Sequence, residues 1–172
     1  MTTATTFIAD WAVTTVAANA NLMWRHFSAL SNELSTPKIV VCPSDGGVTE
    51  AHNWGTNTVA ATAAIQPFSH NRFVSYFVGL EADETRPQVF LAGDRNIVSS
   101  NAPLRTDVTK SAIITLKTNQ QAGIAWSKDL HIEQGDICMG DGSVQQFSSS
   151  RLKQGIRDTD DVNNWVALPG PK

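Results

Sequence analysis

A chain of 172 residues, of which 41% are hydrophobic and 17% charged, has the size and composition of one globular domain with its own core. The net charge of −3 and the lack of a Lys/Arg cluster exclude a large nucleic-acid-binding face. No stretch approaches the ~20 apolar residues of a membrane helix, and the first residues lack the basic start and continuous apolar centre of a signal peptide. The sequence by itself therefore predicts one soluble, cytoplasmic domain over residues 1–172.

The first part of the chain, residues 1–36, is predicted to be helical. In the stretch NLMWRHFSALSNEL, residues 21–34, apolar side chains recur every three or four residues around one broad face. Asn19 and Asn21 are both candidate N-caps for this helix. Pro37 is expected to end it, because proline cannot continue the helical hydrogen-bond ladder.

The next part, residues 37–147, is predicted to form an antiparallel sheet. KIVVC, residues 38–42, reads as a β-branched strand, and the Asp45-Gly46-Gly47 sequence after it as a turn. Residues 58–66 are compatible with a short helix or a strand. Residues 71–80 and 88–94 are expected to pair as antiparallel neighbours, because the acidic link between them is too short for a crossover helix.

Three further elements complete the predicted fold. SAIITLKT, residues 111–118, is a strand, and GDICM and SVQQF, residues 135–139 and 143–147, flank Asp141-Gly142. That dipeptide predicts a type I′ hairpin, in which both central residues have positive φ. Residues 148–172 are expected to be a short capped helix followed by a polar tail, residues 158–172, with one apolar patch. The fold class is therefore α+β, with the N-terminal helical segment packed on an antiparallel meander.

Signatures of catalysis are absent from the sequence: it has no GxSxG elbow, P-loop, GxGxxG or HExxH. Cys42 and Cys138 lie far apart in apolar runs without zinc-site spacing, so buried free thiols are favoured over a zinc site or a disulfide. His26 is expected to be a packing or surface residue, whereas His52 and His70 lie in loops with no pattern that supports a metal role.

His131 and Asp141 are ten residues apart and raise the question of a catalytic pair. A strand over residues 135–139 would extend ~17 Å at about 3.3 Å per residue, which places His131 at the open end of the hairpin, far from the turn. Structural roles are therefore favoured for both. We expect His131 to bond to the backbone where the strand starts, and Asp141-Gly142 to set the turn.

Acidic side chains cluster in two loops, where calcium binding and solvated turns are the alternatives. Neither loop has the spacing of an EF-hand, so solvated turns are favoured. The two clusters are Glu81, Asp83 and Glu84, which precede Arg86, and Asp158, Asp160 and Asp161. The sequence Asp94-Arg95-Asn96, directly after a predicted strand, fits either a site or a turn held by a local Asp–Arg pair.

His131, nine intervening residues and Asp141-Gly142 resemble the H-X9-DG element near the C-terminus of prepilin-type proteins abundant in Planctomycetes and Verrucomicrobia. Further stretches of the chain look like the same family. They are FSALSNELSTPKIVVCPSD, VSYFVGLEADETRPQVFLAGDRNI and GDGSVQQ. Together the similar stretches span much of residues 27–147, which makes the match more specific than the H-X9-DG element alone.

The resemblance implies a non-enzymatic, pilin-like globular head, a structural subunit of a type II secretion or type IV pilus-like filament. Its partners would be other pilin-like subunits and the secretion machinery, at the periplasmic face of the inner membrane. The family's N-terminal cleavage site and apolar anchor helix do not occur in residues 1–20, so the chain is either part of a longer protein or a relative without the anchor. Because related major pseudopilins bind calcium in a C-terminal loop, calcium is the cofactor that the resemblance suggests, with no ligand residues assigned.

A stand-alone calcium- or carbohydrate-binding module is the alternative from another functional class. Trp54, Trp126 and Trp165 are candidate stacking platforms for a sugar, although packing in the core or at a sheet edge is the favoured role for them. A hydrolase comes third, because it would need a pocket that brings His52 or His70 together with carboxylates.

Overall fold

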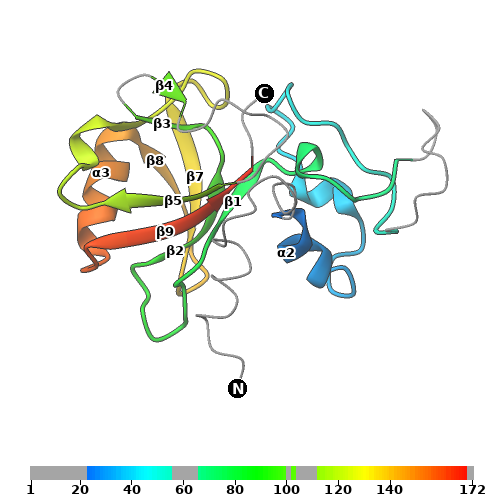
Figure 1. Cartoon of the computed structure of the whole chain (residues 1–172), viewed down its shortest axis with the longest axis horizontal. Helices are drawn as coiled ribbons and strands as arrows, with labels where there is room; N and C mark the ends of the chain where they lie inside the picture. Colours follow the sequence, from blue (N-terminus) through cyan, green and yellow to red (C-terminus); the bar gives the residue numbers. More distant parts are fainter. Residues whose placement is uncertain (1–22, 56–65, 100–101, 104–111, 170–172) are drawn as a thin grey trace.

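The structure is a computed structural model that describes residues 23–55, 66–99, 102–103 and 112–169. It is a mixture of helix and antiparallel sheet in which sheet predominates, so the α+β class is correct. Figure 1 shows two parts: strands and one helix on one side, and α2 with irregular segments on the other. We call residues 23–55 and 66–75 the loop region, and the described residues from 76 onward the sheet region.

The sheet region contains a large and a small antiparallel sheet among the described residues. The large sheet has the strand order β5-β9-β1-β2-β7-β8, and the small sheet has the order β4-β3-β6. The strands of the large sheet are β1 (Tyr76–Gly79), β2 (Phe90–Asp94), β5 (Ala112–Lys117), β7 (Gln134–Met139), β8 (Val144–Ser148) and β9 (Asn163–Leu168). The small sheet consists of β3 (Ile97–Ser99), β4 (Ala102–Pro103) and β6 (Ile124–Trp126).

The strand β9 corrects two predictions. We expected residues 158–172 to be a polar tail with one apolar patch and the sheet to be a meander, but β9 lies inside the large sheet, between the edge strand β5 and β1. Its side chains alternate as a buried strand requires, since Val166 and Leu168 join the core on one face and Ala167 joins the core on the other. Asn164 on this strand is also buried, and its amide donates to the carbonyl of Leu116 at 3.1 Å.

One face of the large sheet is covered by α3 (Ser149–Asp158) and the small sheet. The helix starts as predicted, because the hydroxyl of Ser148 accepts the Arg151 N–H at 3.3 Å. Leu152 and Ile156, one turn apart, are fully buried against the sheet. The core on this face consists of Phe77, Phe90, Ile97, Leu116, Ile124, Trp126, Ile137, Met139, Phe147, Leu152, Ile156, Val166 and Leu168.

The opposite face is covered by the loop region. Here a second core forms around aromatic side chains, and Val78 and Leu80 of the sheet region pack against it. Its buried members are Met23, Trp24, Val40, Ala51, Phe68, Phe73, Val74 and Ala167. The helix α2 (Trp24–Ala29) contributes Trp24, so the described end of the predicted helical segment does pack on the sheet. The candidate caps Asn19 and Asn21 lie outside the described residues, as does most of the segment 58–66.

Two local predictions in the loop region are wrong. The helix α2 ends at Ala29, several residues before the expected stop at Pro37. Residues 38–42 do not form a strand: Pro37–Val40 is a 3-10 helix, η1, and the hydroxyl of Thr36 accepts the Lys38 N–H at its start. Proline at the first position suits a helical turn. Burial alternates from Ile39 to Cys42 as in a strand, but none of the described strands pairs with this run.

The pairings of β1 with β2 and of β7 with β8 are confirmed, but the type I′ turn is not. Only Gly142 has positive φ at the turn, 81°, whereas type I′ would require it at Asp141 as well. The Gly142 N–H donates to the Met139 carbonyl at 2.9 Å and the Met139 N–H donates to the Ser143 carbonyl at 2.8 Å. This pattern is a three-residue loop, a type I turn closed by a bulge at Gly142.

Over the described residues, we find no helix that combines the length and the apolar character needed to cross a membrane.

Candidate functional site

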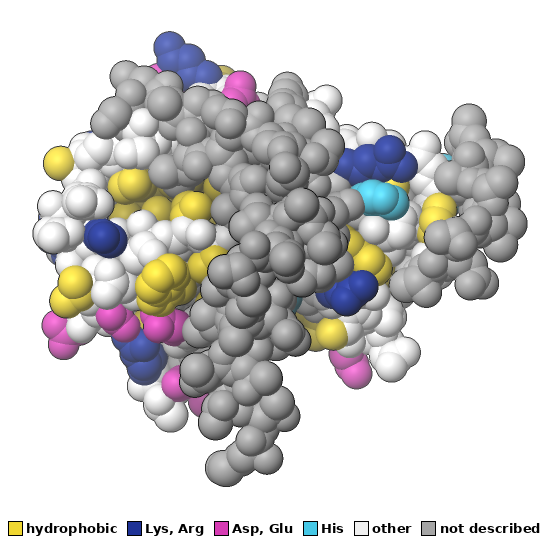
Figure 2. Space-filling view, in the orientation of Figure 1, with side chains coloured by type: hydrophobic (Ala, Val, Ile, Leu, Met, Phe, Trp, Pro, Cys, Tyr) yellow, Lys and Arg dark blue, Asp and Glu magenta, His cyan; other side chains and the backbone are white. Residues whose placement is uncertain are grey.

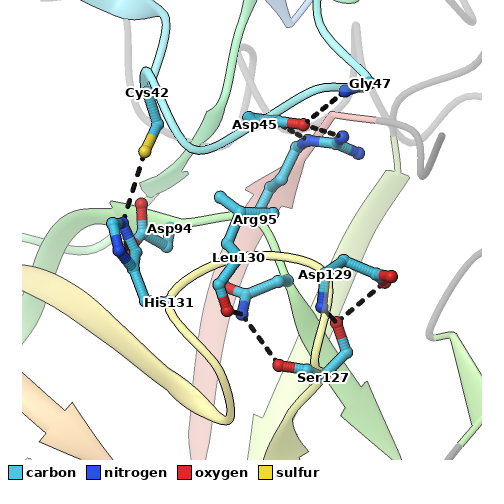
Figure 3. A network of polar contacts seen from close by, with 10 residues as sticks. Cys42, Asp45, Gly47, Asp94, Arg95, Ser127, Asp129, Leu130 and His131 are labelled. Atoms are coloured by element: carbon cyan, nitrogen blue, oxygen red, sulfur yellow. Dashed lines mark hydrogen bonds and ion pairs between the residues drawn. The ribbon is translucent and has the colours of Figure 1, made fainter.

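The strongest polar cluster lies where β2 ends, at three consecutive buried residues, Asp94, Arg95 and Asn96. Figure 3 shows that the side chains of Asp94 and Arg95 reach toward different segments of the chain. A strand end is suited to this, because successive side chains point to opposite sides of the strand. The sequence predicted either a site or a local Asp–Arg pair here. The prediction of a local Asp94–Arg95 pair is wrong, because Arg95 binds Asp45 from the loop region instead.

Asp94 makes two of the contacts in this cluster. Its carboxylate is 1% exposed, and its Oδ2 accepts the Asp136 N–H at 2.7 Å and lies 3.5 Å from Nε2 of His131. The same His131 nitrogen lies 3.3 Å from Sγ of Cys42. Three side chains from three separate segments therefore converge on one point, with one ring nitrogen at its centre (Figure 3).

His131 is presented by an unusual backbone. His131, Ile132 and Glu133 all have positive φ, at 36°, 50° and 62°. Left-handed backbone costs non-glycine residues roughly 1–2 kcal/mol each, so other contacts have to hold this loop. Asn96 supplies them: its amide nitrogen lies 3.3, 3.4 and 3.2 Å from the carbonyl oxygens of Ser127, Leu130 and Gln134, respectively.

Cys42 is held near β2 by a buried ion pair. Nε and Nη2 of Arg95 donate to the two carboxylate oxygens of Asp45 at 2.6 and 2.7 Å, and Asp45 also accepts the Gly47 N–H at 3.0 Å. Burial alone would raise the pKa of Asp45, but the hydrogen bonds and charge of Arg95 outweigh it and hold that pKa below its usual value. The predicted turn at residues 45–47 is thus also the anchor of the Cys42 segment.

The electrostatics of the cluster do not favour a nucleophilic cysteine. Burial raises the pKa of the Cys42 thiol, and the carboxylates of Asp94 and Asp45 add to this effect. Burial likewise raises the pKa of Asp94 and takes the pKa of neighbouring Tyr76 to about 12. A catalytic relay would need the carboxylate and the thiol on opposite nitrogens of the imidazole, whereas both approach Nε2 of His131.

A shared metal ion is the chemistry that this arrangement permits. In the part of the chain that the structure describes, Cys42, Asp94 and His131 are the metal-ligating side chains that gather, with ligand atoms all within 4.8 Å of one another. No pattern in the sequence predicts this group. Cys42 and His131 are 89 residues apart, and no local spacing links either residue to Asp94.

The predicted roles of the H-X9-DG residues are met in part. Asp141 and His131 are not brought together: Asp141 lies in the hairpin turn, and its Oδ1 accepts the Ser143 N–H at 2.8 Å. Asp141-Gly142 does set the turn, as expected. The contacts of His131 differ from the prediction, because its side chain reaches the side chains of Asp94 and Cys42 rather than the start of the strand.

The two acidic clusters contact basic side chains. Arg86, which follows the first cluster, binds Asp161 of the second cluster at 3.0 Å, and Arg151 binds Asp158 at 3.0 Å. Asp83 accepts the Thr85 N–H at 2.7 Å, as a capped turn does. Among the described residues, neither cluster gathers three metal-ligating side chains.

The remaining candidates have structural contacts. Trp126 is a core residue at 2% exposure, Nε1 of Trp54 donates to the Leu34 carbonyl at 2.8 Å, and Trp165 is 39% exposed. Nδ1 of His52 accepts the Gln66 N–H at 3.0 Å, and Nδ1 of His70 lies 2.7 Å from the Ser69 hydroxyl. His26 is partly buried in α2, where burial lowers its pKa. Cys42 and Cys138 are both free thiols.

Comparisons with protein-family models, with curated proteins and with solved structures find no match to this chain. The resemblance to prepilin-type H-X9-DG proteins therefore stays a prediction, and the function has to be argued from the residues and their geometry.

Proposed function

We propose that the chain is the globular head of a pseudopilin-like subunit in a type II secretion or type IV pilus-like filament. In this role the head contacts other subunits and performs no chemistry of its own. The observation that carries the proposal is the structural role of the H-X9-DG residues. His131 holds a loop against β2, and Asp141-Gly142 turns the β7–β8 hairpin, so the residues behind the resemblance stabilise a scaffold.

The chemistry of the cysteine and histidine supports the same proposal. A thiol whose pKa is raised by burial is a poor nucleophile, and Cys42 is 4% exposed. Two carboxylates of the acidic loops, Asp161 and Asp158, are bound by Arg86 and Arg151. A head that serves as a rigid contact surface needs no more than this, whereas a hydrolase would need an accessible activated group.

Exposed apolar side chains provide candidate contact surface. Figure 2 shows hydrophobic side chains on the face of the molecule in the area of β5 and β9. Trp165 on β9 is 39% exposed, and Val162, just before that strand, is 63% exposed. Aromatic and aliphatic side chains at the surface are typical of subunit contacts, and tryptophan is enriched at the positions that dominate binding energy.

In-cell photo-cross-linking tests the proposal. The full-length gene product would carry a photoreactive amino acid at position 162 or 165 in its native host, with the exposed positions Glu84 and Gln154 as matched controls. We expect adducts with pilin-like subunits, identified by mass spectrometry, at 162 and 165 and several-fold fewer at the controls. Adducts without any pilin-like subunit, or equal yields at all four positions, would overturn the proposal.

A further inference from the structure

We propose that Cys42, Asp94 and His131 bind one divalent transition-metal ion, with zinc as the first candidate. The inference goes beyond the proposed function, because a filament head can assemble with or without a metal. Zinc binds cysteine sulfur at about 2.3 Å and histidine nitrogen or carboxylate oxygen at about 2.0–2.2 Å. Tetrahedral angles then separate the ligand atoms by about 3.4–3.6 Å. The structure holds Nε2 of His131 3.3 Å from Sγ of Cys42 and 3.5 Å from Oδ2 of Asp94.

The convergence of the three groups fits a cation better than a hydrogen-bond network. A neutral imidazole nitrogen offers either one proton or one lone pair, so Nε2 of His131 cannot make a well-aligned bond to both Cys42 and Asp94. A metal ion between them would bond to the nitrogen lone pair, the thiolate and the carboxylate at once. It would also compensate the cost of a carboxylate that is 1% exposed and a thiol that is 4% exposed.

The ligand types select the class of metal. Calcium and magnesium take oxygen ligands, whereas a thiolate and an imidazole together favour zinc and its neighbours cobalt and iron. This distinguishes the cluster from the acidic loops at residues 81–84 and 158–161, which offer carboxylates alone. The calcium suggested by the family resemblance would therefore not be the ion of this site.

The surroundings of the three side chains are arranged as in a preorganised metal site. The N–H of Asp136 donates to Oδ2 of Asp94 and fixes the orientation of this carboxylate. Asn96 holds the left-handed loop that presents His131, and Arg95 holds the segment of Cys42 through Asp45. His131 is 25% exposed, which leaves a route for the ion and for water as a further ligand.

Metal binding would tie three segments of the chain together. Cys42 belongs to the loop region, Asp94 ends β2, and His131 belongs to the loop before β7. The bound ion would therefore cross-link the loop region to the large sheet, and its free energy of binding would stabilise the fold. The bound ion would add to the contacts of Asn96 that hold the left-handed backbone of residues 131–133.

Cobalt(II) titration of the purified, reduced and chelator-stripped protein is the first test. Thiolate ligation gives cobalt a charge-transfer band in the near ultraviolet, which carboxylate and imidazole ligation alone do not give. We expect this band to saturate at one cobalt per chain and to disappear when zinc displaces cobalt. Zinc at about a hundredfold excess over its Kd should raise Tm by roughly 5–10 °C. Cobalt that binds without the band, or no saturation, overturns the proposal.

Ligand variants with matched controls locate the ion. Cys42→Ser should abolish the band, and His131→Gln should weaken zinc binding by about tenfold or more, since loss of an outer partner alone typically costs 10–100-fold. Cys138→Ser and His70→Gln remove a half-buried thiol and an exposed imidazole outside the cluster, and both should bind like the wild type.

Asp94 is buried, so Asp94→Asn is informative only if its circular dichroism matches that of the wild type. Cys42→Ser is the smaller change and keeps the proposal testable if the aspartate variant does not fold. A band that survives Cys42→Ser, or one that Cys138→Ser removes, would assign the thiolate ligand elsewhere and refute the site.

Discussion

The loop region and the sheet region bury comparable aromatic cores but are held together by different means. In the sheet region, backbone ladders fix the strands, with β5 and β9 in register over six residue pairs. In the loop region the described regular elements are short, and residues 53 and 67 form an isolated bridge. Its aromatic side chains pack edge to face instead, as Phe68 does against Trp24 and Trp54 at centroid distances of 6.0 and 4.9 Å.

The difference shows where buried polar side chains are needed. A ladder satisfies the backbone and sets the register by itself, whereas an irregular segment requires side chains to fix its position. The loop region accordingly meets the sheet region near the end of β2, through Asp45 with Arg95 and through Cys42 with His131. These contacts lie between the two regions, so they are the natural places to perturb the connection.

Truncating one buried phenylalanine in each region should have the largest effect and should separate the two regions. Phe77 and Phe68 are both 0% exposed, one in the sheet core and one in the loop core. Phe77→Ala and Phe68→Ala should each lower the free energy of unfolding by about 3–5 kcal/mol, measured by urea denaturation. Hydrogen exchange should then differ, because Phe77→Ala exposes β2 and β7 whereas Phe68→Ala exposes mainly residues 66–75.

The hydrogen-exchange pattern is the decisive part of that experiment. If Phe68→Ala lowers protection in β7 and β8 as much as Phe77→Ala does, the two regions unfold as one cooperative unit. The contrast between ladders and side-chain ties would then describe geometry without any difference in local stability.

Removing the carboxylate that faces Arg95 should have the next largest effect. The two side chains are 6% and 0% exposed, so solvent screens this pair little. Asp45→Asn keeps the shape of the side chain but removes the carboxylate charge that faces the buried guanidinium, which should cost about 3 kcal/mol in urea denaturation. The control is Glu50→Gln, because the Lys38–Glu50 pair is 55% exposed on both sides and should change stability by less than about 1 kcal/mol.

The pH dependence of the Asp45→Asn effect provides an independent check. The pKa of Asp45 is lowered in the folded state, so its charged form stabilises the fold above the unfolded pKa of about 3.9. This contribution is lost as the pH falls through the lower folded pKa. The stability difference between wild type and variant should therefore be constant from about pH 5 upward and shrink below about pH 4. A difference that does not change with pH would exclude the ion pair as its source.

Features that depend on neighbouring residues were predictable from the sequence. The β7–β8 hairpin follows from two strand-like runs around Asp141-Gly142, and α3 follows from Ser148 and the spacing of Leu152 and Ile156. The antiparallel pair of β1 and β2 follows from the short link between the two strands. In each case the signal and the structure lie within about twenty residues.

Features that depend on distant contacts were not predictable. In β9, Asn164 reads as a tail residue, yet it is buried and its amide donates to the carbonyl of Leu116 on β5. The run at residues 38–42 reads as a strand, yet none of the described strands pairs with it and η1 forms instead. The candidate site was not predictable for the same reason, since Cys42, Asp94 and His131 meet only after the sheet has brought β2 and β7 together.

The smallest predicted effect tests the backbone of the hairpin, and it compares one glycine from each region. A Cβ at Gly142 or at Gly46 would meet no other atom within 4 Å, so neither substitution by alanine creates a clash. They differ in backbone, since Gly142 has φ of 81° whereas Gly46 is not among the residues with positive φ. Gly142→Ala should therefore lower the free energy of unfolding by about 1–2 kcal/mol, and Gly46→Ala should leave it unchanged or raise it by up to about 1 kcal/mol. Equal effects of the two substitutions in urea denaturation would mean that the bulge at Gly142 is not the conformation that holds this turn in solution.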